Sequence, residues 1–152
     1  MIIKETVQEL GNMTIKEVVH GLEDGTIHAG AVPQDAWPDI SEFSWLSEEF
    51  IRRYADQVDW ANISHFQKLS EGFIDEYADR VDWWWISVRQ KLSEDTIRRY
   101  EDRVDWVSIS KYQRLSENFI HEHAGQVEWS WISAYQKLSE NFICKYADQM
   151  GM

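Results

Sequence analysis

The sequence repeats itself at a fixed step. The segment LSEEFIRRYADQVDWANISHFQK, residues 46–68, returns with its first residue at Leu69, Leu92 and Leu115, and a shorter copy begins at Leu138. Nothing is inserted or deleted between copies, so the period is 23 residues throughout. A constant period of this length is typical of repeat arrays, in which each unit is too small to fold alone and buries its apolar face against its neighbours.

Each copy divides into two segments with helical spacing. In the first segment Ser47 is a good N-cap residue, and apolar residues follow along one stripe: Leu46, Phe50, Ile51, Tyr54 and Val58. In the second segment Asp59 is placed to cap a helix that brings four side chains to one face: Trp60, Ile63, Ser64 and Gln67. Neither segment alternates with period two, so the sequence predicts short helices that depend on packing between repeats.

The predicted fold is mainly all-α: an α-solenoid of short helix pairs, preceded by a small cap segment at residues 1–33. Within that segment, Thr14 can cap a helix that ends near Gly25, IIKETV is a short strand or a helical turn, and GTIHAGAVP is a connector. The array covers residues 34–152. We divide it into a half repeat at 34–45, full repeats at 46–68, 69–91, 92–114 and 115–137, and a partial repeat at 138–152.

Positions that recur in every repeat describe the scaffold rather than the function. The Leu-Ser-Glu start, an isoleucine, a tryptophan, a serine and a glutamine keep their places from copy to copy. We expect the apolar residues to form the core, and the Ser and Gln side chains to make hydrogen bonds where helices touch.

Positions that differ between repeats are the candidates for binding. A helical wheel places Asn62, Trp85 and the equivalent Trp131 away from the buried face, and exposed tryptophans are enriched at binding hot spots. The alternative is that these rings fill a groove between repeats. On the first interpretation, the predicted partner contacts on the second helices are Asn62, Trp84, Trp85, Lys111 and Trp131.

Two rows of acids recur near the turn between the helices, in a chain whose formal net charge is −12. One row includes Asp56, Asp79 and Asp102, and the other includes Asp59, Asp82 and Asp105. This charge disfavours direct nucleic-acid binding and favours a host protein with a basic surface, on which the rows would dock. The alternative is that the second row caps helices and the first only keeps the turn solvated.

No catalytic, cofactor-binding or metal-binding residues are predicted, and we expect the chain not to be an enzyme. Its single cysteine, Cys144, offers no disulfide framework, and His121 and His123 point apart on a helix. No apolar run approaches the roughly 18 residues that a membrane helix needs. We expect no membrane association and a reducing, cytoplasmic location.

The motif L-S-E-x-F-I, V-D-W, I-S-x-Y-Q resembles short tandem repeats of bacteriophage and large DNA virus proteins. The resemblance covers residues 34–152, with departures at Arg89, Thr96 and Gly125. It implies a viral protein acting in the host cytoplasm. By analogy of size, charge and source, it suggests an inhibitor of a host nucleic-acid-handling defence complex, similar in kind to anti-CRISPR proteins. The alternative is a structural or assembly protein that self-associates into a homo-oligomer through its repeats.

Overall fold

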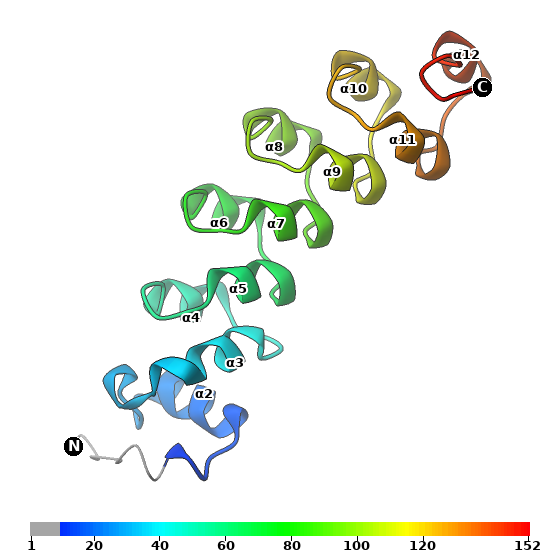
Figure 1. Ribbon diagram of the computed structural model, residues 1–152. Helices are drawn as coiled ribbons and strands as arrows, with labels where there is room; N and C mark the ends of the chain where they lie inside the picture. Colours follow the sequence, from blue (N-terminus) through cyan, green and yellow to red (C-terminus); the bar gives the residue numbers. More distant parts are fainter. Residues whose placement is uncertain (1–9) are drawn as a thin grey trace. The chain divides into compact units, whose positions relative to one another are not determined.

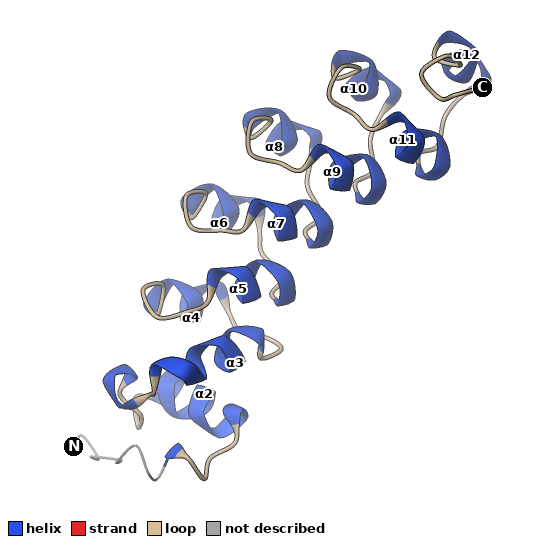
Figure 2. Cartoon of the chain, viewed as in Figure 1, coloured by secondary structure: helices blue, strands red, loops and turns tan. Residues whose placement is uncertain are grey.

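The computed structural model describes residues 10–152, and these residues form only helices, turns and loops (Figure 2). The fold is an α-solenoid, as predicted: short helices recur about every 23 residues and pack against one another. The chain forms two compact units, Met1–Val81 and Asp82–Met152, which are described separately below. Figure 1 shows the helices in chain order.

The first helix of this unit whose bounds are described is α2, Ile15–Asp24, which agrees with the predicted helix. The Thr14 hydroxyl accepts a hydrogen bond from the Glu17 amide at 3.2 Å, and the Glu17 carboxylate accepts one from the Thr14 amide at 3.1 Å. This reciprocal capping box satisfies two amides that a helix start leaves open. The helix ends at Gly25, whose φ of 79° is left-handed and suits glycine. The predicted strand or turn at IIKETV lies outside the described residues.

The connector after α2 contains two 3-10 turns, Ala29–Ala31 and Gln34–Ala36. Helix α2 packs on α3, Trp37–Glu42, and buries Val18, Val19 and Leu22. The Tyr54 hydroxyl donates a hydrogen bond to the Leu22 carbonyl at 2.9 Å, which ties the cap segment to the first full repeat.

The half repeat at residues 34–45 has the geometry of a second helix. In α3 the Ser41 hydroxyl donates to the Trp37 carbonyl at 2.7 Å, and in α5, Trp60–Phe66, the Ser64 hydroxyl donates to the Trp60 carbonyl at the same distance. The unit is completed by α4, Glu48–Arg53, and α6, Glu71–Glu76.

The second unit consists of six helices that alternate between the two types. The second helices of three successive repeats are α7, α9 and α11, and they lie side by side in that order (Figure 1). Their bounds are Trp83–Arg89, Trp106–Tyr112 and Trp129–Tyr135. The first helices are α8, α10 and α12, with bounds Glu94–Arg99, Glu117–Glu122 and Glu140–Lys145.

A glutamine after the second helix joins α9 to the repeat before it. The Gln113 side chain accepts a hydrogen bond from the Leu92 amide at 3.0 Å, and donates to the carbonyls of Ser87 at 2.9 Å and Gln90 at 2.7 Å. In the first unit Gln67 makes the equivalent three bonds. Since these partners are buried backbone groups, the glutamine satisfies atoms that would otherwise be buried without a partner. The expectation that Gln bonds at helix contacts is confirmed.

The recurring Leu-Ser-Glu start also has a structural cause. The Ser47 hydroxyl accepts from the Phe50 amide at 3.0 Å and so caps its own helix. The Glu48 carboxylate accepts from the Ser70 amide of the next repeat at 2.6 Å. In the second unit Glu94 accepts from the Ser116 amide in the same way. The motif therefore encodes one cap within the repeat and one bond between repeats.

The repeated tryptophan packs against the next repeat. The ring of Trp129 stacks on that of Tyr146 with centroids 4.7 Å apart, and its indole nitrogen donates to the Ala124 carbonyl at 3.1 Å. Trp106 stacks in the same manner on His123, 5.1 Å away. His123 is a buried ring at a position that tyrosine occupies in other repeats.

The first helices are shorter than the apolar stripe suggests. Helix α4 ends at Arg53, because Tyr54 adopts φ −112° and ψ 26°, and the chain then turns. The Tyr54 carbonyl accepts from the amides of Gln57 and Val58, which closes the turn. Val58 is buried as predicted, but from this turn and not from a continued helix.

Candidate functional site

Large side chains are exposed along the second helices of the second unit. Trp84 is 51% exposed on α7, Val107 and Tyr112 are 49% and 53% exposed on α9, and Tyr135 is 58% exposed on α11. We call these four residues, together with Lys111 and Trp131, the second-helix surface. Scattered exposed apolar residues are ordinary. Tyr112 and Tyr135, however, are the last residues of adjacent helices, and their ring centroids lie 5.0 and 5.8 Å from the Lys111 ammonium, whereas Trp84 lies near the start of α7. Exposed aromatic residues on adjacent helices are candidates for an interaction site.

The predicted tryptophan contacts differ in their exposure. Trp84 is exposed, whereas Trp85 and Trp131 are partly buried and so less accessible than Trp84. The rings of Trp84 and Trp85 meet edge to face with centroids 4.4 Å apart. Trp84 is therefore available to a partner over much of its surface, and Trp85 supports it from the side.

The helical-wheel expectation for the Asn62 position was wrong. The Asn62 amide donates to the Pro38 carbonyl of the preceding second helix at 3.1 Å, and the equivalent Ser108 is buried. This position faces the neighbouring repeat because a solenoid helix is covered on two sides. The alternative interpretation, that these side chains fill the space between repeats, holds for Asn62 and Ser108.

Lys111 and Trp131 come together across two repeats. The Lys111 ammonium lies 4.4 Å from the Trp131 ring centroid, 5.0 Å from that of Tyr112 and 5.8 Å from that of Tyr135. Attraction between a cation and the faces of aromatic rings holds this cluster in one arrangement. The cluster is thus a positively charged aromatic site at the C-terminal ends of α9 and α11.

The second row of acids caps helices. The carboxylates of Asp59, Asp82 and Asp105 accept from the amides three residues on, at 2.9, 3.1 and 2.9 Å. These carboxylates lie at the N-terminal ends of the second helices, whereas the Lys111 cluster lies at the opposite ends. Contact of these acids with a partner stays a prediction.

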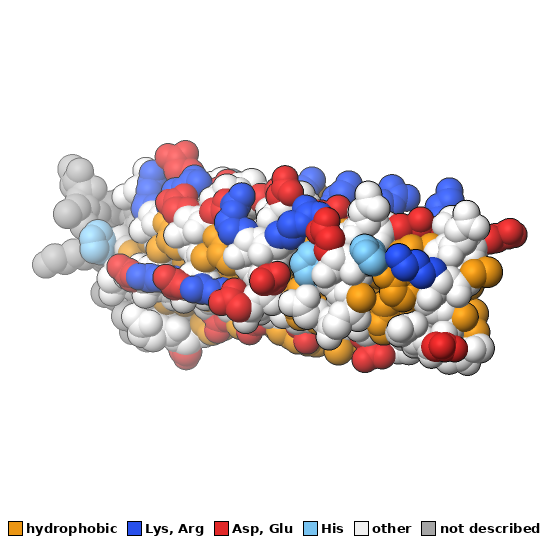
Figure 3. Space-filling view, turned by 90° about the horizontal axis from the view of Figure 1, so that it is seen from above, with side chains coloured by type: hydrophobic (Ala, Val, Ile, Leu, Met, Phe, Trp, Pro, Cys, Tyr) orange, Lys and Arg blue, Asp and Glu red, His pale blue; other side chains and the backbone are white. Residues whose placement is uncertain are grey.

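The first row of acids is exposed. Asp56 is paired with Arg80 at 2.8 Å, and Asp79 and Asp102 are exposed in the equivalent turns of the next two repeats. Arginines of the first helices are paired with acids as well: Arg52 contacts Glu76 at 2.8 Å. The hydrogen bond to Glu76 raises the pKa of Arg52. Figure 3 shows acidic and basic side chains intermixed on one face.

A row of cations escaped the sequence analysis. In each full repeat, the residue after the repeated glutamine is basic and exposed. Within residues 10–152 these four cations take part in no ion pair: Lys68, Lys91, Arg114 and Lys137. The signal was present in the sequence. In the four full repeats, the segment from the repeated tryptophan to this cation contains Lys or Arg but no Asp or Glu, although the chain as a whole is acidic.

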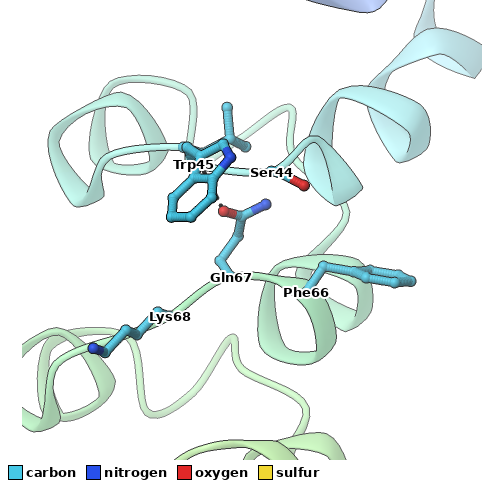
Figure 4. Close-up of a pocket in the computed structure, with 6 residues that line it drawn as sticks. Ser44, Trp45, Phe66, Gln67 and Lys68 are labelled. Atoms are coloured by element: carbon cyan, nitrogen blue, oxygen red, sulfur yellow. Dashed lines mark hydrogen bonds between the residues drawn. The ribbon is translucent and has the colours of Figure 1, made fainter.

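Open grooves lie beside these cations in each unit. In the first unit a groove of about 410 Å³ is lined by Trp45, Phe66, Gln67 and Lys68, with Ser44 and Leu46. Figure 4 shows that Phe66 and Lys68 project in opposite directions from the chain around Gln67. Trp45 is 93% exposed and has a φ of 79°, a backbone conformation that costs energy for a residue with a side chain.

In the second unit the equivalent groove has about 480 Å³ and runs between the ends of α7 and α9. Val88 and Leu92 line it, together with Tyr112 and the cations Lys91 and Arg114. The lining of the groove is therefore mixed: it has apolar side chains, one aromatic ring and three cations, the third being Arg89.

Among the described residues, no cluster of His, Cys, Asp or Glu could hold a metal ion. Cys144 is exposed and unpaired by any disulfide. No helix in residues 10–152 is long and apolar enough to cross a membrane. Comparisons with protein-family models, curated proteins and solved structures gave no match.

Proposed function

We propose that the chain is a non-enzymatic protein-binding module that docks on its partner through the second-helix surface. The observation that carries the proposal is the exposure of Trp84, Tyr112 and Tyr135 on three adjacent helices of one unit. Aromatic anchors of this kind supply most of the free energy in protein interfaces, and leaving them in water is unfavourable.

The anchors are also held in place before any partner arrives. Trp84 packs against Trp85, and the Lys111 ammonium contacts the rings of Tyr112, Trp131 and Tyr135. Binding then orders few side chains, which lowers the entropic cost of association.

The test is affinity capture from candidate host lysates with wild-type protein and a variant that carries Trp84→Ser, Tyr112→Ser and Tyr135→Ser. We expect the wild type to retain a stoichiometric partner and the variant to lose it. If the three residues are hot spots, each contributes about 2 kcal/mol or more, which is roughly a thirtyfold change in Kd.

The matched control carries three serine substitutions at exposed residues elsewhere in the same unit: Asn118, Gln126 and Asn141. All three proteins should show the same far-ultraviolet circular dichroism, since every substituted side chain is exposed. The surface variant should melt at a slightly lower temperature, because it loses the contacts with Trp85 and Lys111. Equal capture by wild type, surface variant and control would show that the partner binds elsewhere.

A finer proposal concerns the target: an inhibitor of a host nucleic-acid-handling defence complex, docking on a basic surface as anti-CRISPR proteins do. Its support is the net charge of −12 and the exposed acids of the turns, among them Asp56, Asp79 and Asp102. The Asp→Asn variant at these three positions should weaken capture of a basic partner at low salt. Unchanged capture at every salt concentration would count against this target.

The alternative is an assembly protein that associates with copies of itself. The observation in its favour is the uneven charge: in the four full repeats, the segments from the repeated tryptophan to the final cation contain no Asp or Glu, whereas the turns carry rows of acids. Copies could pair through these opposite charges. Sedimentation equilibrium across a range of concentrations and salt should then reveal salt-sensitive oligomers, and a monomer at all concentrations would exclude them.

A further inference from the structure

Lys91 and Arg114 line the groove of the second unit, and the protein does not pair either cation with an acid. The residue after the repeated glutamine is a cation in three successive repeats: Lys91, Arg114 and Lys137. No ion pair within residues 10–152 involves these cations. By contrast, Arg98 on the first-helix side contacts Glu122 at 2.9 Å and Asp95 at 3.0 Å. The exposed cations at the grooves are therefore free to bind an external anion.

The acids lie outside the segments that form the groove. The segments 83–91, 106–114 and 129–137 contain no Asp or Glu. The nearest acids along the chain, Glu94 and Glu117, accept hydrogen bonds from the amides of Ser116 and Ser139 in the next repeat. The residues that line the groove include the cations Arg89, Lys91 and Arg114 and no Asp or Glu, so the lining is positively charged in a protein of net charge −12.

We propose that this row binds an acidic peptide segment in the polyproline II conformation, with one carboxylate at every third residue. This inference rests on the proposed function and specifies the chemistry of the partner. Stacked helices lie about 8–10 Å apart, so the cations repeat at about that interval. A polyproline II helix has three residues per turn and rises about 3.1 Å per residue, so every third side chain returns to one side after about 9 Å.

The groove suits the rest of such a peptide. The residues between the carboxylates lie against the apolar side chains of Val88, Leu92 and Tyr112, which line the groove together with Lys91 and Arg114. Aromatic-lined grooves recognise polyproline II segments in general, because the segment is already ordered and loses little entropy on binding. A β-strand fits less well, since its side chains return to the same face every ~6.6 Å.

A peptide also fits better than a nucleic acid. Phosphates follow one another every ~3.4 Å along a strand, so about three would lie opposite each cation and two would remain unpaired. The net charge of −12 adds repulsion to a long polyanion. One carboxylate per repeat, however, is matched by one cation per repeat.

The test is fluorescence anisotropy with a labelled probe of four Glu-Pro-Pro triplets. We expect salt-sensitive binding, and at least tenfold weaker binding by the variant Lys91→Gln, Arg114→Gln, Lys137→Gln. The control variant makes the same charge change away from the row, at Lys16, Arg53 and Lys145, and should bind like wild type. All substituted side chains are exposed, so both variants should fold.

Two further probes decide between explanations. One has the same four Glu and eight Pro with all Glu grouped at one end, and the other is an oligothymidine of similar length. Binding of the triplet probe at least fivefold tighter than both supports the proposal. Equal binding of the two peptides would refute the spacing, and tighter binding of oligothymidine would refute the choice of a peptide.

The result also separates this inference from the proposed function. If no probe binds but partner capture still depends on Trp84, Tyr112 and Tyr135, the acidic-peptide inference fails and the docking surface stands. If capture is also independent of these residues, both fail.

Discussion

Replacing Gln113 by leucine tests whether the repeated glutamines, here called the glutamine ladder, hold the repeats together. The substitution keeps the approximate volume of the side chain but removes bonds to the Leu92 amide and to the carbonyls of Ser87 and Gln90. A buried amide left without a partner costs about 1–3 kcal/mol, and each lost carbonyl bond about 0.5–1.5 kcal/mol. The free energy of unfolding should therefore fall by about 2–6 kcal/mol.

This loss is large beside the total stability of a domain, which is about 5–15 kcal/mol. The assay is urea denaturation followed by circular dichroism and tryptophan fluorescence, with both probes because repeat arrays can unfold in parts. The control is Gln126→Leu, the same change at an exposed side chain, which should alter stability by less than about 0.5 kcal/mol. Gln136→Leu should fall between the two, because Gln136 makes equivalent bonds but is only half-buried. Similar stabilities for Gln113→Leu and Gln126→Leu would refute the ladder.

Three further predictions concern caps and packing. Asp105→Ala should lower the free energy of unfolding by about 0.5–2 kcal/mol because it removes an N-cap, whereas the exposed Asp102→Ala should have little effect; parallel melts distinguish them. Tyr54→Phe removes the hydrogen bond that ties α2 to the repeats, so hydrogen exchange in α2 should accelerate; unchanged protection would contradict this role. Gly21→Ala would place a methyl group 2.4 Å from a carbon of Ile27. We expect the free energy of unfolding, measured by denaturant titration, to fall by about 1 kcal/mol, whereas an increase would show that the cap segment repacks freely.

Much of the fold could be predicted from the sequence because its signals are local. Ser47 and Asp59 cap helices through bonds to amides three residues on, and the recurrence of these residues marks each helix start. Thr14 and Gly25 bound α2 for the same reason. The 23-residue period then fixes which elements are equivalent, so a single repeat predicts the whole array.

The candidate site was less predictable because it depends on how repeats meet. A helical wheel treats a helix as having one buried face, but Ser108 is buried against the preceding repeat on a second face. The contact of Lys111 with Trp131 joins residues of different repeats and has no local signal. The cations beside the grooves were visible in the sequence, but the net charge of −12 drew attention to the acids.

The most direct test of the docking surface is hydroxyl-radical footprinting of the chain alone and bound to its captured partner. Side chains covered by a partner are oxidised more slowly, and Trp84, Tyr112 and Tyr135 are exposed enough in the free protein to report this. We predict protection of all three rings, with no change at the exposed Cys144. Unchanged oxidation of the three rings in a saturated complex would contradict the proposed binding surface.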